Sequence, residues 1–264
     1  MQPRFSEVDV GWAQSLRESY QQLLAQHLDA IQKALPNRQI FAWQAVANDY
    51  RQLALVLYAS GEPVDTVRGL LCDAARAHLG MVRLRGNEQS GCEPTALDYS
   101  VGNSCSTYRA ICEALLAHDL DLAQVLATFV WDPPEARYVG PTSVVCTDLR
   151  QGAAYALRYL LLDEVDQANA VLASRDRLPE DVVGEYLMLR GLVSNSGERV
   201  VKGVTLALAA HARLANEPEN YRVPDYFLHI PALGLASCAL QRGLLTLADL
   251  PSRDVYLPRD MIVS

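Results

Sequence analysis

Residues 225–243 read DYFLHIPALGLASCALQRG and form an almost continuous apolar stretch of helical character. Pro231 favours the start of a helix, because its ring fixes φ near the helical value and the first turn does not need its missing amide hydrogen. In residues 233–240 apolar side chains point to all sides of such a helix, which indicates burial. Gly243 suits the left-handed position past a helix end. We therefore expect a buried core helix that runs to Gly243.

The small residues of this stretch should let neighbouring helices approach closely; they are Ala232, Gly234, Ala236 and Ser237. A membrane span is the alternative interpretation. The low-charge run of residues 226–240 is 15 residues long and includes His229 and Pro231, whereas a bilayer requires about 20 apolar residues. We therefore interpret the stretch as a core helix.

Length and composition are typical of a globular protein. The chain has 264 residues, of which 50% are hydrophobic and 20% charged. A chain of this size buries roughly three quarters of its unfolded surface. We expect a single all-helical domain over residues 1–264, with possible sub-halves 1–102 and 103–264. The first residues contain no apolar segment of the secretory type, so we expect a cytoplasmic protein.

Apolar residues recur every three or four positions along most of the chain, which predicts amphipathic helices. Short polar turns interrupt the pattern at Gly61, Asp119, Asp163, residues 195–197 and Gly243, and a second helical pattern returns from each. The turns are unevenly spaced, unlike those of regular solenoids. The predicted fold class is all-α: an irregular array or bundle of helical hairpins with a short extended C-terminal tail at residues 255–258.

Several boundaries follow from the same analysis. Ser6 is the expected N-cap of the first helix, and Ser104 or Ser106 that of the helix after residue 103. Irregular connections are expected at residues 85–103 and 131–145, and the first is long enough to be a functional loop. A short helix is expected at residues 244–250.

The six cysteines are Cys72, Cys92, Cys105, Cys112, Cys146 and Cys238. They could pair, but no C-x-x-C motif occurs and four of them lie within apolar helical patterns. We favour free, buried thiols.

No known catalytic, nucleotide-binding or metal-binding motif occurs in the sequence, and no two histidines are three or four residues apart. We therefore expect no enzyme activity, no cofactor and no metal. His78 and His211 are predicted to be core or boundary histidines. Two catalytic alternatives stay open: a nucleophile pair of Cys105 and His118, and a helical hydrolase that uses His118, Asp119 and Asp121.

Acidic residues are concentrated in two stretches. Residues 110–136 contain five acids and no Lys or Arg, and residues 160–186 contain seven acids and two arginines. With a net charge of −8, this distribution argues against a nucleic-acid partner and favours a basic protein. Many such acids are simply solvated. If the stretches fold together, the candidate partner-binding residues are Glu113, Asp119, Asp121, Asp132, Glu135, Asp163, Glu164, Asp166, Glu180 and Asp181.

The stretch from Asp225 and the following VYLPRDMI resemble the C-terminal signature of the immunity 49 family of bacterial polymorphic toxin systems. In that family an LPALGLAALA-type helix leads through a short connection to a terminal Tyr-Leu-Pro segment. The matching residues here are Pro231, Ala232, Leu233, Gly234, Leu235, Ala236, Tyr256, Leu257 and Pro258. The resemblance covers about 40 residues of the chain.

The resemblance implies a cytoplasmic, non-catalytic protein that binds a cognate toxin and blocks it. The acidic charge of the chain adds the expectation that the toxin is basic and attacks nucleic acid. We expect neither nucleic acid nor a membrane as a partner of the protein itself. The alternative function, from another functional class, is that of a helical-repeat adaptor, which binds a protein other than a toxin. The sequence leaves homo-oligomerisation open.

Overall fold

The computed structural model describes residues 10–88, 103–130, 148–173, 178–220, 222–251 and 256–263. These residues form helices and no β-strand, which confirms the predicted all-α class. The α-helices are α1 (Val10–Lys33), α2 (Pro36–Ala59), α3 (Val64–Glu88), α5 (Ser104–Leu116), α6 (Leu120–Ala127), α7 (Asp148–Leu161), α8 (Val165–Ala173), α9 (Glu180–Val193), α10 (Gly197–Ala215), α11 (Ile230–Gln241) and α12 (Arg259–Ile262). Single 3₁₀ turns occur at η3 (Pro218–Asn220), η4 (Pro224–Tyr226) and η5 (Leu247–Asp249).

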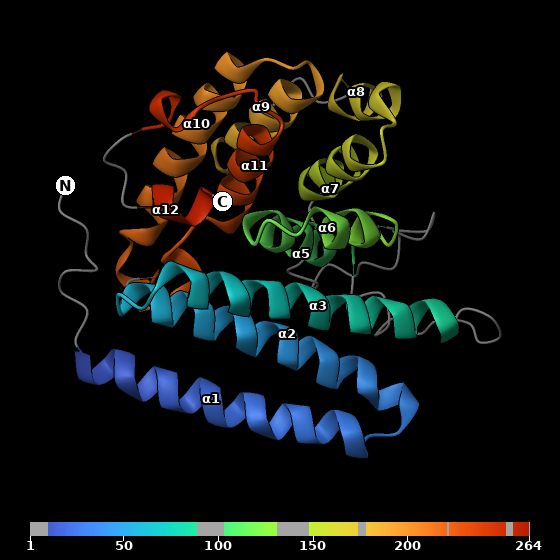
Figure 1. Cartoon of the computed structure of the whole chain (residues 1–264), viewed down its shortest axis with the longest axis vertical. Coiled ribbons are helices and arrows are strands. Elements are labelled where there is room, and N and C mark those ends of the chain that lie inside the picture. The colour runs from blue at the N-terminus through green and yellow to red at the C-terminus, as the bar shows by residue number, and fades with distance from the viewer. Residues whose placement is uncertain are drawn as a thin grey trace.

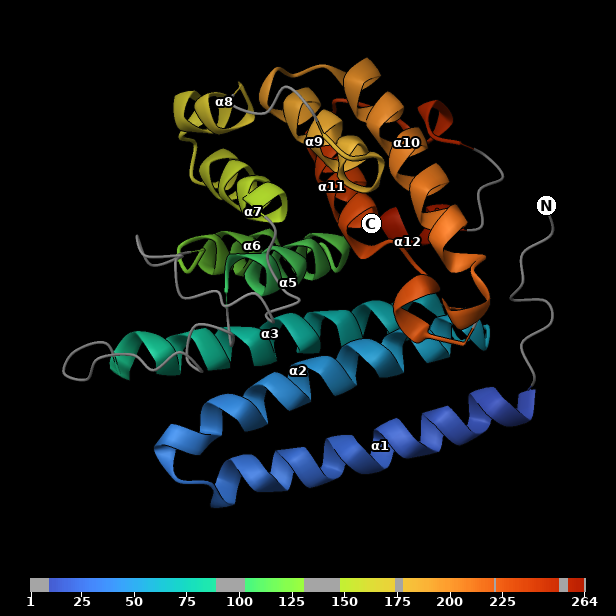
Figure 2. The same cartoon turned by 180° about the vertical axis from the view of Figure 1, so that it is seen from behind.

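The helices form an array of antiparallel pairs. The long helices α1, α2 and α3 lie side by side at one end of the molecule, and the view from behind shows the same layer (Figures 1 and 2). α5 packs against α3, α6, α7 and α11 and so occupies the centre of the array. α9 and α10 form a further tightly packed pair beyond it.

Residues with a left-handed backbone conformation lie at the hairpin turns. Positive φ angles occur at Gly61 (77°), His118 (61°), Asp163 (59°), Asn195 (52°) and Gly243 (68°). Each lies at or directly beside one of the five predicted turns. Gly, Asn and Asp adopt this conformation more readily than other residues, so the turn positions follow from local sequence. His118 is the exception, because the left-handed residue is one position before the Asp119 expected there.

The predicted core helix is α11, and residues 232–239 are all buried. Its N-cap is His229, whose Nδ1 accepts a hydrogen bond from the backbone N–H of Ala232 at 3.1 Å. Pro231 lies in the first turn, as expected. The helix ends at Gln241, two residues earlier than predicted, and Gly243 then supplies the left-handed turn.

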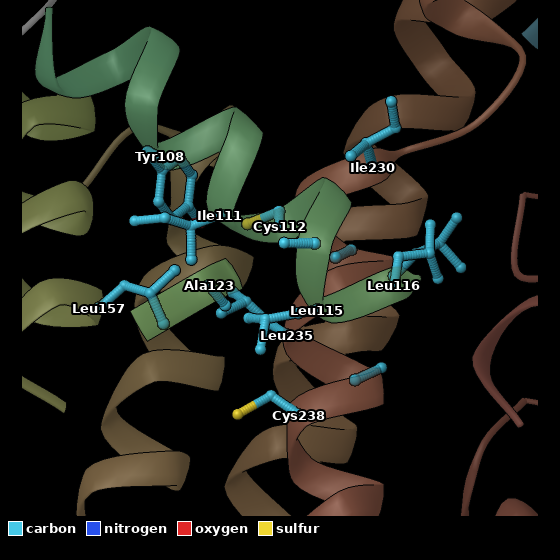
Figure 3. Packing of buried hydrophobic residues seen from close by; sticks show 14 of the residues in the cluster. Tyr108, Ile111, Cys112, Leu115, Leu116, Ala123, Leu157, Ile230, Leu235 and Cys238 are labelled. Atoms are coloured by element: carbon cyan, nitrogen blue, oxygen red, sulfur yellow. The ribbon is translucent and has the colours of Figure 1, made fainter. Parts of the chain in front are cut away.

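Small residues of α11 allow close contact with α5. A Cβ atom added to Gly234 would lie 2.5 Å from the backbone oxygen of Cys112. Ser237 Oγ donates a hydrogen bond to the backbone oxygen of Leu115 at 2.9 Å. Around this contact, apolar side chains from α5, α6, α7 and α11 meet in the core (Figure 3). The prediction that small residues allow close approach is confirmed.

The C-terminal segment is anchored to the N-terminal layer. Tyr256 and Leu257 are buried, and the chain then forms α12, which was not predicted. Arg68 of α3 donates to the backbone oxygen of Met261 at 3.1 Å and also to those of Asp260 and Val263. The helix expected at residues 244–250 is reduced to the single turn η5, capped by Thr246.

Other boundary predictions were wrong or fall outside the described residues. The side chain of Asn103, not of Ser104 or Ser106, caps α5 by accepting from the backbone N–H of Ser106 at 2.9 Å. α3 continues to Glu88, so helix replaces the start of the loop expected at residues 85–103. The expected cap at Ser6 and the connection at residues 131–145 lie outside the described residues.

Candidate functional site

Glu113 is the clearest correction to the predicted partner-binding set. Its side chain is 0% exposed, and its carboxylate pairs with the Arg51 guanidinium of α2, which is 9% exposed. A second contact, from Arg51 Nη2 to Glu113 Oε2, measures 3.3 Å. Glu113 lies on the side of α5 that faces α2, within the core. Glu113 therefore does not contribute to a surface.

Asp119 has a local structural role. Its Oδ1 accepts a hydrogen bond from the backbone N–H of Leu122 at 2.9 Å, which caps α6. Its Oδ2 lies 3.5 Å from Nη2 of Arg76. The carboxylate is thus engaged on both sides, and its negative charge is partly compensated.

Four of the predicted acids lie on α6 or directly after α7, and these two helices pack against each other. Arg158 of α7 donates to the backbone oxygen of Val130 at 2.6 Å. One turn later, the backbone oxygen of Leu161 accepts from Gln124 of α6 at 3.5 Å. The C-terminal end of α7 therefore packs against the C-terminal half of α6. We call Asp121 on α6, together with Asp163, Glu164 and Asp166 directly after α7, the acidic edge.

The acidic edge also exposes apolar side chains. Leu120 is 42% exposed, Val125 38% and Val165 41%. Asp121, Asp163 and Asp166 of the same segments are also exposed. Exposed apolar side chains next to acidic ones can contribute to a surface that binds a basic protein.

The remaining predicted acids are not part of this edge. Glu180 and Asp181 are exposed in the first turn of α9, and the Glu180 carboxylate pairs with Arg213 of α10. Asp132 and Glu135 lie outside the described residues. Four of the ten predicted residues thus belong to the acidic edge, and Asp163, Glu164 and Asp166 lie within four consecutive positions of the chain.

The sequence analysis did not identify a second group of polar residues, the ionic cluster, which lies between α2, α5, α9 and the start of α11. Tyr108 donates a hydrogen bond to Glu185 Oε2 at 2.8 Å, and His229 Nε2 lies 3.7 Å from Glu185 Oε1. Arg109 Nη1 lies 3.5 Å from Asp225 Oδ1. The members of the ionic cluster are Arg51, Tyr108, Arg109, Glu113, Glu185, Asp225 and His229.

Burial controls the protonation of this cluster. It raises the pKa of Glu185, an effect that the hydrogen bond from Tyr108 opposes. It lowers the pKa of His229 to about 4, and the positive charges of Arg150 and Arg109 act in the same direction. Since His229 Nδ1 accepts a hydrogen bond, the proton of the neutral ring lies on Nε2, the atom that faces Glu185.

Two buried histidines match the prediction of core histidines. His211 Nε2 donates to the backbone oxygen of Tyr226 at 3.1 Å, and burial lowers the pKa of His211 to about 3. His78 Nε2 lies 3.1 Å from Thr107 Oγ1, and burial lowers the pKa of His78 to about 3. Their hydrogen bonds account for their positions without a ligand.

Neither catalytic alternative finds support in the geometry. Cys105 and His118 belong to the two ends of α5, roughly 20 Å apart at 1.5 Å per residue. Asp119 caps α6, Asp121 faces solvent, and His118 Nδ1 contacts Gln241 Nε2 at 3.1 Å. These side chains thus have separate local roles.

The cysteines differ in part from the prediction. Cys72, Cys112 and Cys238 are free and buried, as expected. Cys105 is disulfide-bonded, and its partner lies outside the described residues. Cys105 is the second residue of α5 and is only half-buried, so the apolar core does not enclose it.

Within the described ranges, no group of three or more His, Cys, Asp or Glu side chains is arranged to hold a metal ion. None of the helices described here is both long and apolar enough to cross a bilayer. Comparison of the chain with protein-family models, with curated proteins and with solved structures finds no match.

Proposed function

We propose that the protein is a non-catalytic immunity protein that binds a cognate bacterial toxin by direct contact and neutralises it. The observation that carries the proposal is the acidic edge, where exposed Leu120 adjoins Asp121 in the chain and exposed Val165 lies between Glu164 and Asp166. Exposed apolar side chains supply desolvation energy on binding, and the surrounding carboxylates attract a basic partner and speed its association.

The resemblance at the C-terminus supports the same proposal. Residues 232–236 of α11 are buried, α11 packs against α5, and Tyr256 and Leu257 are buried in the C-terminal segment. They therefore maintain the scaffold and leave the contact with the partner to surface residues. Within this proposal the partner is a basic, nucleic-acid-attacking toxin in the cytoplasm, and neither nucleic acid nor membrane takes part.

Growth protection tests this function. A basic polypeptide encoded beside the protein would be expressed under an inducible promoter, alone and together with the protein. We expect growth arrest with the polypeptide alone and normal growth when both are present. If the protein binds only a non-toxic partner and does not restore growth in the presence of a toxic polypeptide, the immunity function is contradicted. That result would favour the helical adaptor.

A further inference from the structure

The ionic cluster has a side that is open to solvent. The side chains of Arg109 and Asp225 are 42% and 41% exposed, whereas those of Glu185 and His229 are 8% and 12% exposed. The cluster therefore extends from the surface to the core, with a guanidinium at its outer end. This site is separate from the acidic edge and does not depend on the proposed function.

Two guanidinium groups lie near this outer end, the half-exposed Arg109 and the buried Arg51. Arg109 lies one helical turn before Glu113 on α5, and Glu113 holds Arg51, so two guanidinium groups are close together. Burial lowers the pKa of Arg109, and the charges of Arg51 and, more weakly, of Arg150 act in the same direction, whereas the carboxylates of Asp225 and Glu113 oppose this shift. Additional negative charge near Arg109 would therefore be favourable.

Asp225 compensates this charge only in part. Its carboxylate oxygen lies 3.5 Å from Arg109 Nη1, a long contact between two half-exposed groups. Such exposed pairs contribute little to stability, about 0–1 kcal/mol. Asp225 lies on η4, a single 3₁₀ turn, and is not fixed within a long helix.

We infer that the open side of the ionic cluster binds a small oxyanion, a phosphate or carboxylate group, which Arg109 holds in the place now taken by the Asp225 carboxylate. The planar guanidinium can donate two parallel hydrogen bonds to such a group. Arg51 and Arg150 add attraction through their charge. Asp225 then acts as an internal competitor of the ligand.

Thermal unfolding with added sodium phosphate, and separately with sodium malonate, tests the inference against sodium chloride of equal ionic strength. We expect one of the two anions to raise Tm saturably by about 3–5 °C. The anion with the larger effect identifies the group as phosphate or carboxylate. Equal Tm values in all three salts would overturn the inference.

Three variants locate the effect. Arg109→Gln should abolish the rise in Tm, whereas Arg213→Gln, which removes an arginine from an exposed ion pair with Glu180, should retain it. Asp225→Asn should bind the anion several-fold more tightly, because the competing carboxylate is gone. If Arg109→Gln does not fold, anion binding by the Asp225→Asn variant tests the inference. Unchanged or weaker binding by Asp225→Asn, or a full response from folded Arg109→Gln, would overturn the inference.

Discussion

Glu113 of α5 and Arg51 of α2 form an ion pair that is almost completely removed from water, with side-chain exposures of 0% and 9%. The pair joins the N-terminal layer of long helices to the centre of the array. Removing two charges from water is costly, and their mutual attraction offsets that cost only while both are present. The pair therefore constrains how α2 and α5 pack.

Replacing one partner should destabilise the protein strongly. Glu113→Gln leaves the Arg51 charge buried without a counter-charge, and we expect a loss of about 3–5 kcal/mol in the free energy of unfolding. Urea unfolding followed by circular dichroism measures it. The matched control is Glu180→Gln, which breaks the exposed pair with Arg213 and should cost less than about 1 kcal/mol. Similar losses in the two variants would contradict the burial of Glu113.

Replacement by alanine should have opposite effects on stability at two glycines: Gly234, at the contact between α11 and α5, and Gly69, on α3. Gly234→Ala places a Cβ atom 2.5 Å from the backbone oxygen of Cys112, so the helices must separate. We expect a loss of about 1–3 kcal/mol from overpacking. Gly69→Ala on α3 meets nothing within 4 Å and should stabilise the protein by roughly 0.5–1 kcal/mol. If Gly234→Ala proves neutral or stabilising, the close approach described here is wrong.

Acid should unfold the protein because of its buried histidines. Burial lowers the pKa of His78 and His211 to about 3 and that of His229 to about 4, whereas the unfolded chain has values near 6.5. The unfolded state thus binds more protons, so stability present above pH 6.5 is lost as pH falls toward 4. The slope for three such groups approaches about 4 kcal/mol per pH unit.

Urea midpoints measured between pH 7.5 and 4.5 check this dependence. His78→Gln keeps a side-chain donor for Thr107 but removes one titrating group, so its pH dependence should be weaker by about one third. A midpoint that does not change from pH 7 to pH 5 would show that these histidines are accessible to water.

Neutralising the acidic edge should weaken binding of a basic partner while the fold persists. The variant combines Asp121→Asn, Asp163→Asn and Asp166→Asn, since asparagine tolerates the left-handed backbone at position 163. We expect about tenfold weaker binding at low salt and a smaller dependence on salt concentration. Glu18→Gln, Glu198→Gln and Glu219→Gln together change the net charge equally on other elements and serve as the control. Equal effects of the two triple variants would show that only net charge matters.

Local sequence explains much of the fold. The hairpin turns at Gly61, Asp163, Asn195 and Gly243 could be predicted because turn chemistry is local. The burial of α11 could be predicted because its apolar residues face all sides. The N-cap at Asn103 was missed because adjacent serines suited the same role. Helix α12 was missed because it packs against α3 and α11, and its hydrogen bond from Arg68 joins residues almost 200 positions apart.

The candidate sites depend on contacts between distant parts of the chain. Arg51 and Glu113 are 62 residues apart, and Tyr108 and Glu185 are 77 apart, so no local pattern indicates that they meet. Counting charges along the sequence therefore included Glu113 in a surface from which its burial excludes it. The acidic edge could be predicted in part, because its members lie at turns and helix starts, where acids are usually exposed.

Capture of the partner tests the central claim most directly. The tagged protein would be isolated from its native cell at low and high salt, and the bound chains identified by mass spectrometry and tested for toxicity. We predict a stoichiometric, basic, toxic polypeptide that the acidic-edge variant loses and the control variant retains. Recovery of a non-toxic housekeeping complex, or equal capture of the toxic polypeptide by both triple variants, would contradict this account.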